Sequence, residues 1–106
     1  MRSVCILGST GSVGVQSLDV ARSLGLKVSG LSAYSNVELL AAQARQFSPT
    51  MVAIGDIRAQ ERAEAAFSEM SPAPELFVGP EGLVQLAASG EHDIVGHGTV
   101  GVCSLN

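Results

Sequence analysis

The sequence predicts an α/β fold, in which a doubly wound parallel sheet is covered by helices on both faces to give three layers, α/β/α. The first observation is that short apolar runs, typical of buried parallel strands, alternate with longer segments of helical periodicity. A second is a glycine-rich loop where the first apolar run meets the first helical segment. A third is composition: hydrophobic residues make up 46% and aromatic residues 4%, so aliphatic side chains must build the core.

Strand and helix segments alternate along the 106 residues, a length that suits one domain. The expected strands, each a short apolar run, cover 4–7, 27–33, 51–56, 75–79 and 93–95. The expected helices, each with apolar residues three or four apart, cover 12–24, 36–47, 57–70 and 80–89. Residues 98–106 show no clear pattern. Strand–helix units repeated in this order indicate a parallel sheet with right-handed crossovers.

The helix boundaries follow from capping and breaking residues. Gly25 ends the first helix, and Ser35 followed by Glu38 forms a capping-box pattern at the start of the second. Asp56 is the expected cap of the third helix, and Pro80 lies in the first turn of the fourth. On the first helix, the side expected to face the sheet comprises Val13, Ser17, Val20, Ala21 and Leu24.

The glycine-rich loop covers residues 6–14 and reads ILGSTGSVG. In a doubly wound sheet a ligand crevice lies at the carboxyl ends of the strands, where backbone N–H groups and the helix dipole favour an anion. Gly8 would allow the tight turn, Gly11 would let a pyrophosphate approach the backbone, and Gly14 would let the helix pack closely. We therefore predict a Rossmann-like phosphate cradle at this loop.

The spacing of these glycines, G-x-x-G-x-x-G, is a variant of the dinucleotide-binding pattern G-x-G-x-x-G. Its context is right, since a strand precedes it and a helix follows. Hydroxyl groups that suit phosphate oxygens come from Ser9, Thr10 and Ser12. The alternative is a plain glycine-rich turn between strand and helix that binds no ligand.

The end of the second strand bears on the choice of cofactor. An NAD site usually places Asp or Glu there to hold the ribose 2′-hydroxyl, but residues 32–36 read SAYSN and contain no carboxylate. The missing acid removes a repulsion against a 2′-phosphate and so favours NADP. Ser35, Asn36 and neighbouring N–H groups are the candidates to hold that phosphate, although this stretch contains no Arg or Lys. Alternatively, these residues only cap the following helix.

Charge and cysteine usage disfavour several classes of protein. A net charge of −4 and scattered basic residues argue against non-specific binding to nucleic acid or to an anionic membrane. The apolar runs fall far short of the roughly 20 residues that a membrane helix needs. Cys5 and Cys103 form no spacing motif and are interpreted as thiols in a reducing compartment. We therefore expect a cytoplasmic protein whose partner is a dinucleotide.

No catalytic or metal-binding residues are expected in this chain. His92 and His97 have no Cys or carboxylate cluster at metal-ligand spacing and are interpreted as structural or solvated. The charged residues within 58–69 fit a solvated helix face, and no pair resembles a nucleophile with its base.

Three stretches of the sequence are informative in combination: ILGSTGSVG followed by QSLDVA, then VSGLSAYSNVELLAAQARQFSPTMVAIGD, then VGPEGLVQLA. Together they cover most of residues 4–90 and resemble the 1-deoxy-D-xylulose 5-phosphate reductoisomerase family. The resemblance implies an enzyme that reduces and rearranges 1-deoxy-D-xylulose 5-phosphate to 2-C-methyl-D-erythritol 4-phosphate. This reaction is an oxidoreductase step of the methylerythritol phosphate route to isoprenoids. The pieces are weak singly, and their combination is specific.

The resemblance implies NADPH as the cofactor, with Mg²⁺ or Mn²⁺ in the full-length enzymes. The implied cofactor-binding residues are Gly8, Thr10, Gly11, Ser12, Val13, Ala33, Tyr34, Ser35 and Asn36. Those of the glycine loop would contact the cofactor phosphates, and those after the second strand would lie near the adenosine 2′-phosphate. Some family members carry a basic residue where this chain has Ser35, a departure that bears on the strength of NADP preference and not on the site itself.

The resemblance also sets expectations for the extent of the chain. Residues 1–106 are expected to form a single NADPH-binding domain, because the family's Asn-Lys-Glu motif, metal-binding carboxylates and catalytic and C-terminal domains belong to later segments. Residues 97–106 depart from the family pattern. Such a truncated domain would be catalytically inactive alone. The full-length family is dimeric, and the apolar stretch VGVCSL is expected to favour artificial self-association of the fragment.

Two other functions stay open at this point. Aspartate-semialdehyde dehydrogenases resemble the chain at a T-G-x-x-G turn, but they would need a catalytic Cys in a larger second domain, and Cys103 has no such setting. A non-enzymatic nucleotide-sensing module is the other alternative. It predicts a reading frame of about 106 residues, whereas the reductoisomerase predicts a frame that continues.

Overall fold

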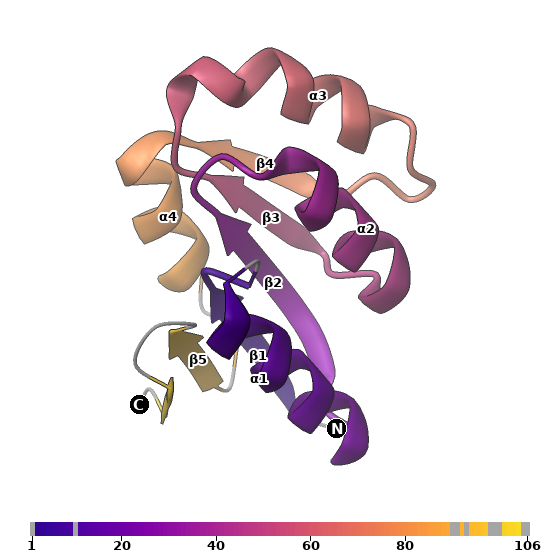
Figure 1. Cartoon of the computed structure of the whole chain (residues 1–106), viewed down its shortest axis with the longest axis vertical. Coiled ribbons are helices and arrows are strands. Elements are labelled where there is room, and N and C mark those ends of the chain that lie inside the picture. Colours follow the sequence, from indigo (N-terminus) through magenta and orange to yellow (C-terminus); the bar gives the residue numbers. More distant parts are fainter. Residues whose placement is uncertain (1, 10, 90–91, 93, 98–100, 105–106) are drawn as a thin grey trace.

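The computed structural model of the chain describes residues 2–9, 11–89, 92, 94–97 and 101–104. Within them, six strands form one sheet in the order β4-β3-β2-β1-β5-β6 (Figure 1). The strands are β1 (Ser3–Leu7), β2 (Lys27–Ala33), β3 (Met51–Ile54), β4 (Glu75–Val78), β5 (Ile94–His97) and β6 (Gly101–Ser104). The helices are α1 (Ser12–Ser23), α2 (Val37–Phe47), α3 (Gln60–Ser68) and α4 (Gly79–Ala87), with a 3-10 turn over Ile57–Ala59. None of these described helices is long and apolar enough to cross a membrane.

The sheet has the topology that the alternating pattern predicts. Strands β1 to β5 run parallel, and the chain places β2, β3 and β4 successively on one side of β1. It then returns to place β5 on the other side of β1. In open α/β sheets, ligands bind at the carboxyl edge where the strand order reverses in this way. The fold therefore puts the end of β1 at a favoured binding position.

The last two strands differ from the sequence prediction. β6 pairs antiparallel with β5, with Val95 opposite Cys103, although residues 98–106 show no strand pattern in the sequence. The four residues of β6 include glycine and serine, so hydrophobic alternation has too few positions to become visible. β5 begins at Ile94 and ends at His97, later than the predicted 93–95, and Asp93 lies outside the described residues.

Helices cover both faces of the sheet, which confirms the three-layer prediction. Val52 and Ile54 of β3 belong to a core cluster with residues of α1, α2 and α3, whereas Met51 and Ala53 belong to a cluster with Leu86 of α4. Because successive residues of a strand point to opposite faces, α4 lies across the sheet from the other helices. Figure 1 shows α1, α2 and α3 spread along the sheet, with α4 standing apart from them.

The helix boundaries confirm most capping predictions and correct one. Gly25, with a φ of 71°, ends α1, and the Asp56 side chain caps the turn before α3 by accepting a hydrogen bond from Arg58 N at 3.0 Å. The predicted cap of α2 is wrong by one residue. Asn36 Oδ1 accepts the hydrogen bond from Leu39 N at 3.2 Å, so Asn36, and not Ser35, is the N-cap.

The predicted inner face of α1 is wrong at Val20 and Leu24, whose side chains are 55% and 68% exposed. The residues that face the sheet are Gly14, Leu18 and Ala21, spaced four and three apart. Apolar character alone favours the valines and leucines of this segment, but the close contact of Gly14 with the preceding loop sets the rotation of the helix.

Cys5 of β1 is fully buried on the face covered by α4, and burial raises the pKa of its thiol from 9.0 to about 12. We expect Cys5 to resist iodoacetamide at pH 8 while the protein is folded and to react in urea, as mass spectrometry of its peptide would show. Rapid labelling of the folded protein would contradict this environment.

The thiol of Cys5 ionises at a lower pH in the unfolded chain than in the folded protein. Its contribution to the free energy of unfolding is therefore fully present below pH 9 and is lost as the pH rises towards 12.

Candidate functional site

The candidate site lies at the carboxyl ends of β1 and β2, where the glycine loop leads into α1. Gly8 follows β1 with a φ of 73°, a conformation that suits glycine and turns the chain sharply. Gly11 is the N-cap of α1 with an ordinary φ of −77°, and its N–H donates to the Gly8 carbonyl at 3.2 Å. The turn therefore brings the start of the helix directly over the end of the strand.

Gly14 lies in the first turn of α1 and touches the backbone of the loop. A Cβ added there would stand 2.3 Å from the Gly8 carbonyl oxygen and 2.6 Å from Ser9 Cα. These are backbone atoms that cannot swing aside as a flexible side chain does. The close helix packing predicted for Gly14 is confirmed, and no other residue fits this contact without moving the helix or the loop.

A buried polar network holds the loop in place. Gly8 N–H donates to Ser32 Oγ at 3.0 Å, and Ser9 N–H donates to the Ser32 carbonyl at 2.8 Å. The fully buried Ser9 also exchanges two hydrogen bonds with Gln43 of α2: Ser9 Oγ donates to Oε1 at 2.6 Å, and Nε2 donates to the Ser9 carbonyl at 2.8 Å. The loop is thus tied to β2 and to α2 independently of any ligand.

This network corrects the interpretation of Ser9 as a phosphate donor. Its hydroxyl is fully buried and is directed at Gln43, so it positions the loop instead of contacting a ligand. Gln43 was not among the predicted site residues. The signal for it was present, because Gln43 is a polar residue within the buried stripe that also contains Leu40 and Ala44.

Replacing Gln43 by leucine is expected to destabilise the protein by about 1–3 kcal/mol. The substitution keeps the volume but leaves the buried Ser9 carbonyl without its side-chain partner. Urea unfolding measures the change. Gln46→Leu is the matched control, because Gln46 is exposed on the same helix and its replacement is expected to change stability by less than about 0.5 kcal/mol. Equal effects of both substitutions would contradict a role for the buried network.

The end of β2 presents the second group of predicted residues. Ala33 is buried in the core, so only its backbone faces the edge of the sheet, whereas the Tyr34 side chain is 65% exposed. The carbonyls of Ala33 and Tyr34 accept hydrogen bonds from Gly55 N at 2.9 Å and Asp56 N at 2.8 Å. These bonds tie the β2–α2 turn to the end of β3.

The structure brings basic side chains to this turn from a distant part of the sequence. Arg62 of α3 donates from Nη2 to the Ser35 carbonyl at 3.3 Å. Arg58 donates to both carboxylate oxygens of Asp56, from Nε at 3.1 Å and from Nη2 at 3.3 Å. Residues 32–36 themselves contain no Arg or Lys, but the folded chain supplies arginine to this turn from a later segment. Arg62 is 27 positions beyond Ser35, and only the pairing of β2 with β3 brings the two together.

The Asp56–Arg58 pair shifts the ionisation of both groups. Side-chain hydrogen bonds from Arg58 hold the pKa of Asp56 below its usual value, and the same bonds raise the pKa of Arg58. The carboxylate is therefore ionised at neutral pH and neutralises Arg58. Stability from this pair is present above the ordinary pKa of the carboxyl, 3.8, and is lost as the pH falls below it.

The remaining predicted residues are placed less completely. Thr10 lies outside the described residues, and Ser12 and Val13 are described by their backbone alone, as the first residues of α1. His92 has the structural role expected of it: its Nδ1 bonds with Ser29 Oγ, and its Nε2 lies 2.8 Å from the Leu86 carbonyl. The side chain of His97 lies outside the described part. In the described residues, no group of His, Cys, Asp or Glu side chains could hold a metal ion.

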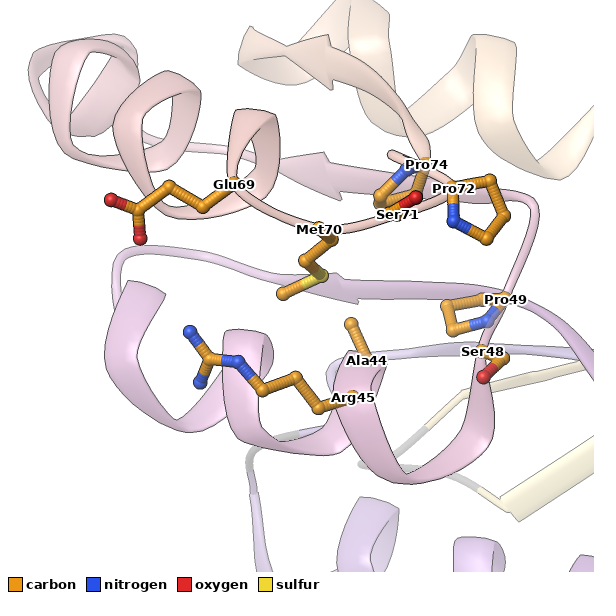
Figure 2. A pocket seen from close by; sticks show the side chains of 9 residues that line it. All are labelled: Ala44, Arg45, Ser48, Pro49, Glu69, Met70, Ser71, Pro72 and Pro74. Atoms are coloured by element: carbon orange, nitrogen blue, oxygen red, sulfur yellow. The ribbon is translucent and has the colours of Figure 1, made fainter.

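A separate groove of about 380 Å³ lies between the ends of α2 and α3 (Figure 2). Ser48 and Pro49, which follow α2, line one side, and Glu69 and Met70, which follow α3, line another. The helices end at the edge of the sheet where the parallel strands begin. The groove is thus at the opposite edge from the glycine loop and takes no part in the candidate site.

Comparison with known proteins identifies what this arrangement is similar to. The family model described as 1-deoxy-D-xylulose 5-phosphate reductoisomerase matches residues 4–106. A reductoisomerase of Synechococcus sp. is 43% identical over an alignment of 107 positions that covers 99% of this chain and 27% of that protein. One from Acetivibrio thermocellus is 48% identical over 86 residues, covering 80% of this chain and 22% of that protein.

Solved structures that resemble this fold include reductoisomerases. A crystal structure of DOX-P reductoisomerase in complex with NADPH, fosmidomycin and magnesium superposes with a TM-score of 0.82 at 26% identity, covering 90% of this chain and 24% of that one. The Zymomonas mobilis reductoisomerase in complex with NADPH gives a TM-score of 0.77 at 32% identity, covering 85% of this chain and 24% of that one. The resemblance read from the sequence is thereby confirmed, and the chain spans about a quarter of the length of the relatives it matches.

Proposed function

Because this chain belongs to the 1-deoxy-D-xylulose 5-phosphate reductoisomerase family, we propose that it forms the part of such an enzyme that binds NADPH. The observation that carries the proposal is the contrast between two glycines of the loop. Gly14 is required by the fold, whereas a Cβ at Gly11 would meet only the Gly8 carbonyl oxygen, at an ordinary 3.6 Å, within the described part of the chain. A ligand that approaches the backbone at Gly11 explains a glycine there.

The residues present fit a pyrophosphate at this position. The first N–H groups of a helix have no partner four residues earlier, so the backbone of Ser12 and Val13 can donate to phosphate oxygens. The N-terminal end of the α1 dipole favours negative charge at the same point. The Ser9–Gln43–Ser32 network fixes the loop before the cofactor arrives, which lowers the entropic cost of binding.

The predicted residues then divide by task. The backbone N–H groups of Ser12 and Val13, together with Thr10, would hold the pyrophosphate, while Gly8 forms the turn and Gly11 lets the pyrophosphate approach the backbone. The turn formed by Ala33, Tyr34, Ser35 and Asn36 would hold the adenosine ribose and its 2′-phosphate. The bound cofactor supplies a hydride to a carbonyl substrate, and this chain's residues bind and orient it.

The rest of the reaction is proposed for the longer protein, because the chain spans only 27% of curated relatives such as the Synechococcus enzyme. We propose that segments beyond this part provide the metal ligands, the catalytic residues and the site for 1-deoxy-D-xylulose 5-phosphate. Homodimer formation and a cytoplasmic location are part of the same proposal. The free, buried thiol of Cys5 supports a reducing compartment.

Calorimetric titration of the protein with NADPH and with NADH tests the proposal. Saturable binding of NADPH, at least tenfold tighter than that of NADH, is the expected result. Absence of binding by either dinucleotide would contradict a cofactor site in this chain by itself, and the same titration of the longer protein would then distinguish a site completed by further segments from a loop that is only a turn.

A further inference from the structure

The step from NADH to NADPH adds a single group, the 2′-phosphate on the adenosine ribose. This group carries about −1.5 to −2 charges at pH 7 and is held by cationic side chains, most often arginine, in sites that prefer NADP. The turn that follows β2 contains Tyr34, Ser35 and Asn36, none of which is charged. If the site prefers NADPH, the positive charge must come from outside the turn.

Arg62 meets the geometric requirement. Its Nη2 donates to the Ser35 carbonyl at 3.3 Å, so its guanidinium lies against the turn where the ribose would sit. The side chain is 58% exposed, and a guanidinium has five N–H donors, of which this bond uses one. The planar donor fork of arginine matches the geometry of a phosphate.

The charge of Arg62 is only partly compensated, because Asp56 acts on it from beyond ion-pair distance. Its nearest carboxylate is Glu38, at 3.8 Å from Nε, and the Glu38 side chain is 77% exposed. Ion pairs of this exposed kind contribute little, and Glu38 is free to turn into solvent when a stronger anion arrives. Arg58 differs, because the carboxylate of Asp56, only 13% exposed, binds it through two nitrogen atoms.

We propose that Arg62 recognises the 2′-phosphate of NADPH and thereby replaces the basic residue that the β2–α2 turn lacks. This assignment rests on the proposed function of the glycine loop. It gives α3 a role in cofactor choice, since its first turn carries Arg62 across to the end of β2. The Ser35 carbonyl positions the guanidinium, and Glu38 holds it until the phosphate arrives.

Titration of Arg62→Gln with NADPH and NADH tests the assignment. We expect the affinity for NADPH to fall about tenfold and the affinity for NADH to change less than twofold. Adenosine 2′,5′-bisphosphate and adenosine 5′-monophosphate, which differ only in the 2′-phosphate, should repeat this split. Arg62→Lys should restore part of the difference, because it restores the charge without the planar fork.

Two matched variants sharpen the test. Arg58→Gln removes an arginine of the same segment that Asp56 already binds and that lies near Tyr34, and it should leave NADPH clearly preferred over NADH. Glu38→Gln removes the competing carboxylate and should tighten NADPH binding about two- to fivefold. Thermal unfolding of each variant reports whether the fold is retained.

The outcomes separate this assignment from the proposed function. Equal loss of NADPH and NADH binding in Arg62→Gln, or no loss of either, would overturn the assignment and leave the dinucleotide site in place. A selective loss of NADPH binding in Arg58→Gln alone would also overturn it. If the unaltered protein binds neither dinucleotide, both the site and the assignment fail.

Discussion

Replacing Gly14 by alanine is expected to destabilise the protein by about 3 kcal/mol or more and to abolish NADPH binding. The new Cβ would lie 2.3 Å from the Gly8 carbonyl oxygen and within 3 Å of two backbone atoms of Ser9. Relief requires either α1 or the loop to move. Movement of α1 would displace the helix N-terminus from the end of β1, and movement of the loop would break the hydrogen bonds by which Ser32 and Gln43 hold it. Urea unfolding followed by circular dichroism measures the loss.

The expected loss of stability depends on where the glycine lies in the fold, and a second glycine of α1's surroundings serves as the comparison. Gly25→Ala tests a different constraint, because a Cβ there would meet no described atom within 4 Å, although its φ of 71° adds backbone strain. That variant should lose stability through strain alone and keep the cofactor site intact. An unfolding free energy of Gly14→Ala within about 1 kcal/mol of the unaltered protein would contradict the close packing described for α1.

Replacing Gly11 by alanine is expected to reduce NADPH affinity at least thirtyfold with little effect on stability. The residue has an ordinary φ of −77°, and its added Cβ would be 3.6 Å from the Gly8 carbonyl oxygen, so the fold accepts alanine. Loss of glycine at this N-cap should cost no more than about 1 kcal/mol. A methyl group at this point would instead stand between the helix N–H groups and the pyrophosphate.

Calorimetry with NADPH and thermal unfolding of the same Gly11→Ala sample measure both quantities. NADH binding should fall by a similar factor, since both dinucleotides contain the pyrophosphate. This distinguishes Gly11 from Arg62, whose effect is confined to NADPH. Unchanged binding of NADPH by Gly11→Ala would place the pyrophosphate elsewhere.

The local hydrophobic pattern was sufficient to predict the helices and strands whose apolar residues recur at regular spacing. The predicted span of β2, residues 27–33, is the span observed, and α2 lies within the predicted 36–47 with Val37, Leu40, Ala41 and Ala44 buried at helical spacing. These segments have dense apolar periodicity and clear ends. The positive φ of Gly8 and the close contact of Gly14 also follow the glycine pattern, because both are demanded by a tight turn from strand to helix.

Features that depend on contacts between distant segments were not predictable in the same way. The wrong face of α1 arises because Gly14, with no side chain, decides the rotation against the apolar Val20 and Leu24. Ser9 looks like a phosphate donor until Gln43, 34 positions later, is seen to take its hydroxyl. Arg62 enters the site only through the neighbouring positions of β2 and β3 in the sheet.

The central claim is that NADPH lies over the start of α1, with its adenosine end at the β2–α2 turn. Amide resonances of isotopically labelled protein, recorded with and without NADPH, test it most directly. We predict saturable shifts for residues 11–13 and 34–36, and none for Ser48 or Met70 in the groove at the opposite edge (Figure 2). Shifts confined to that groove, with the amides of the glycine loop unmoved, would contradict the account.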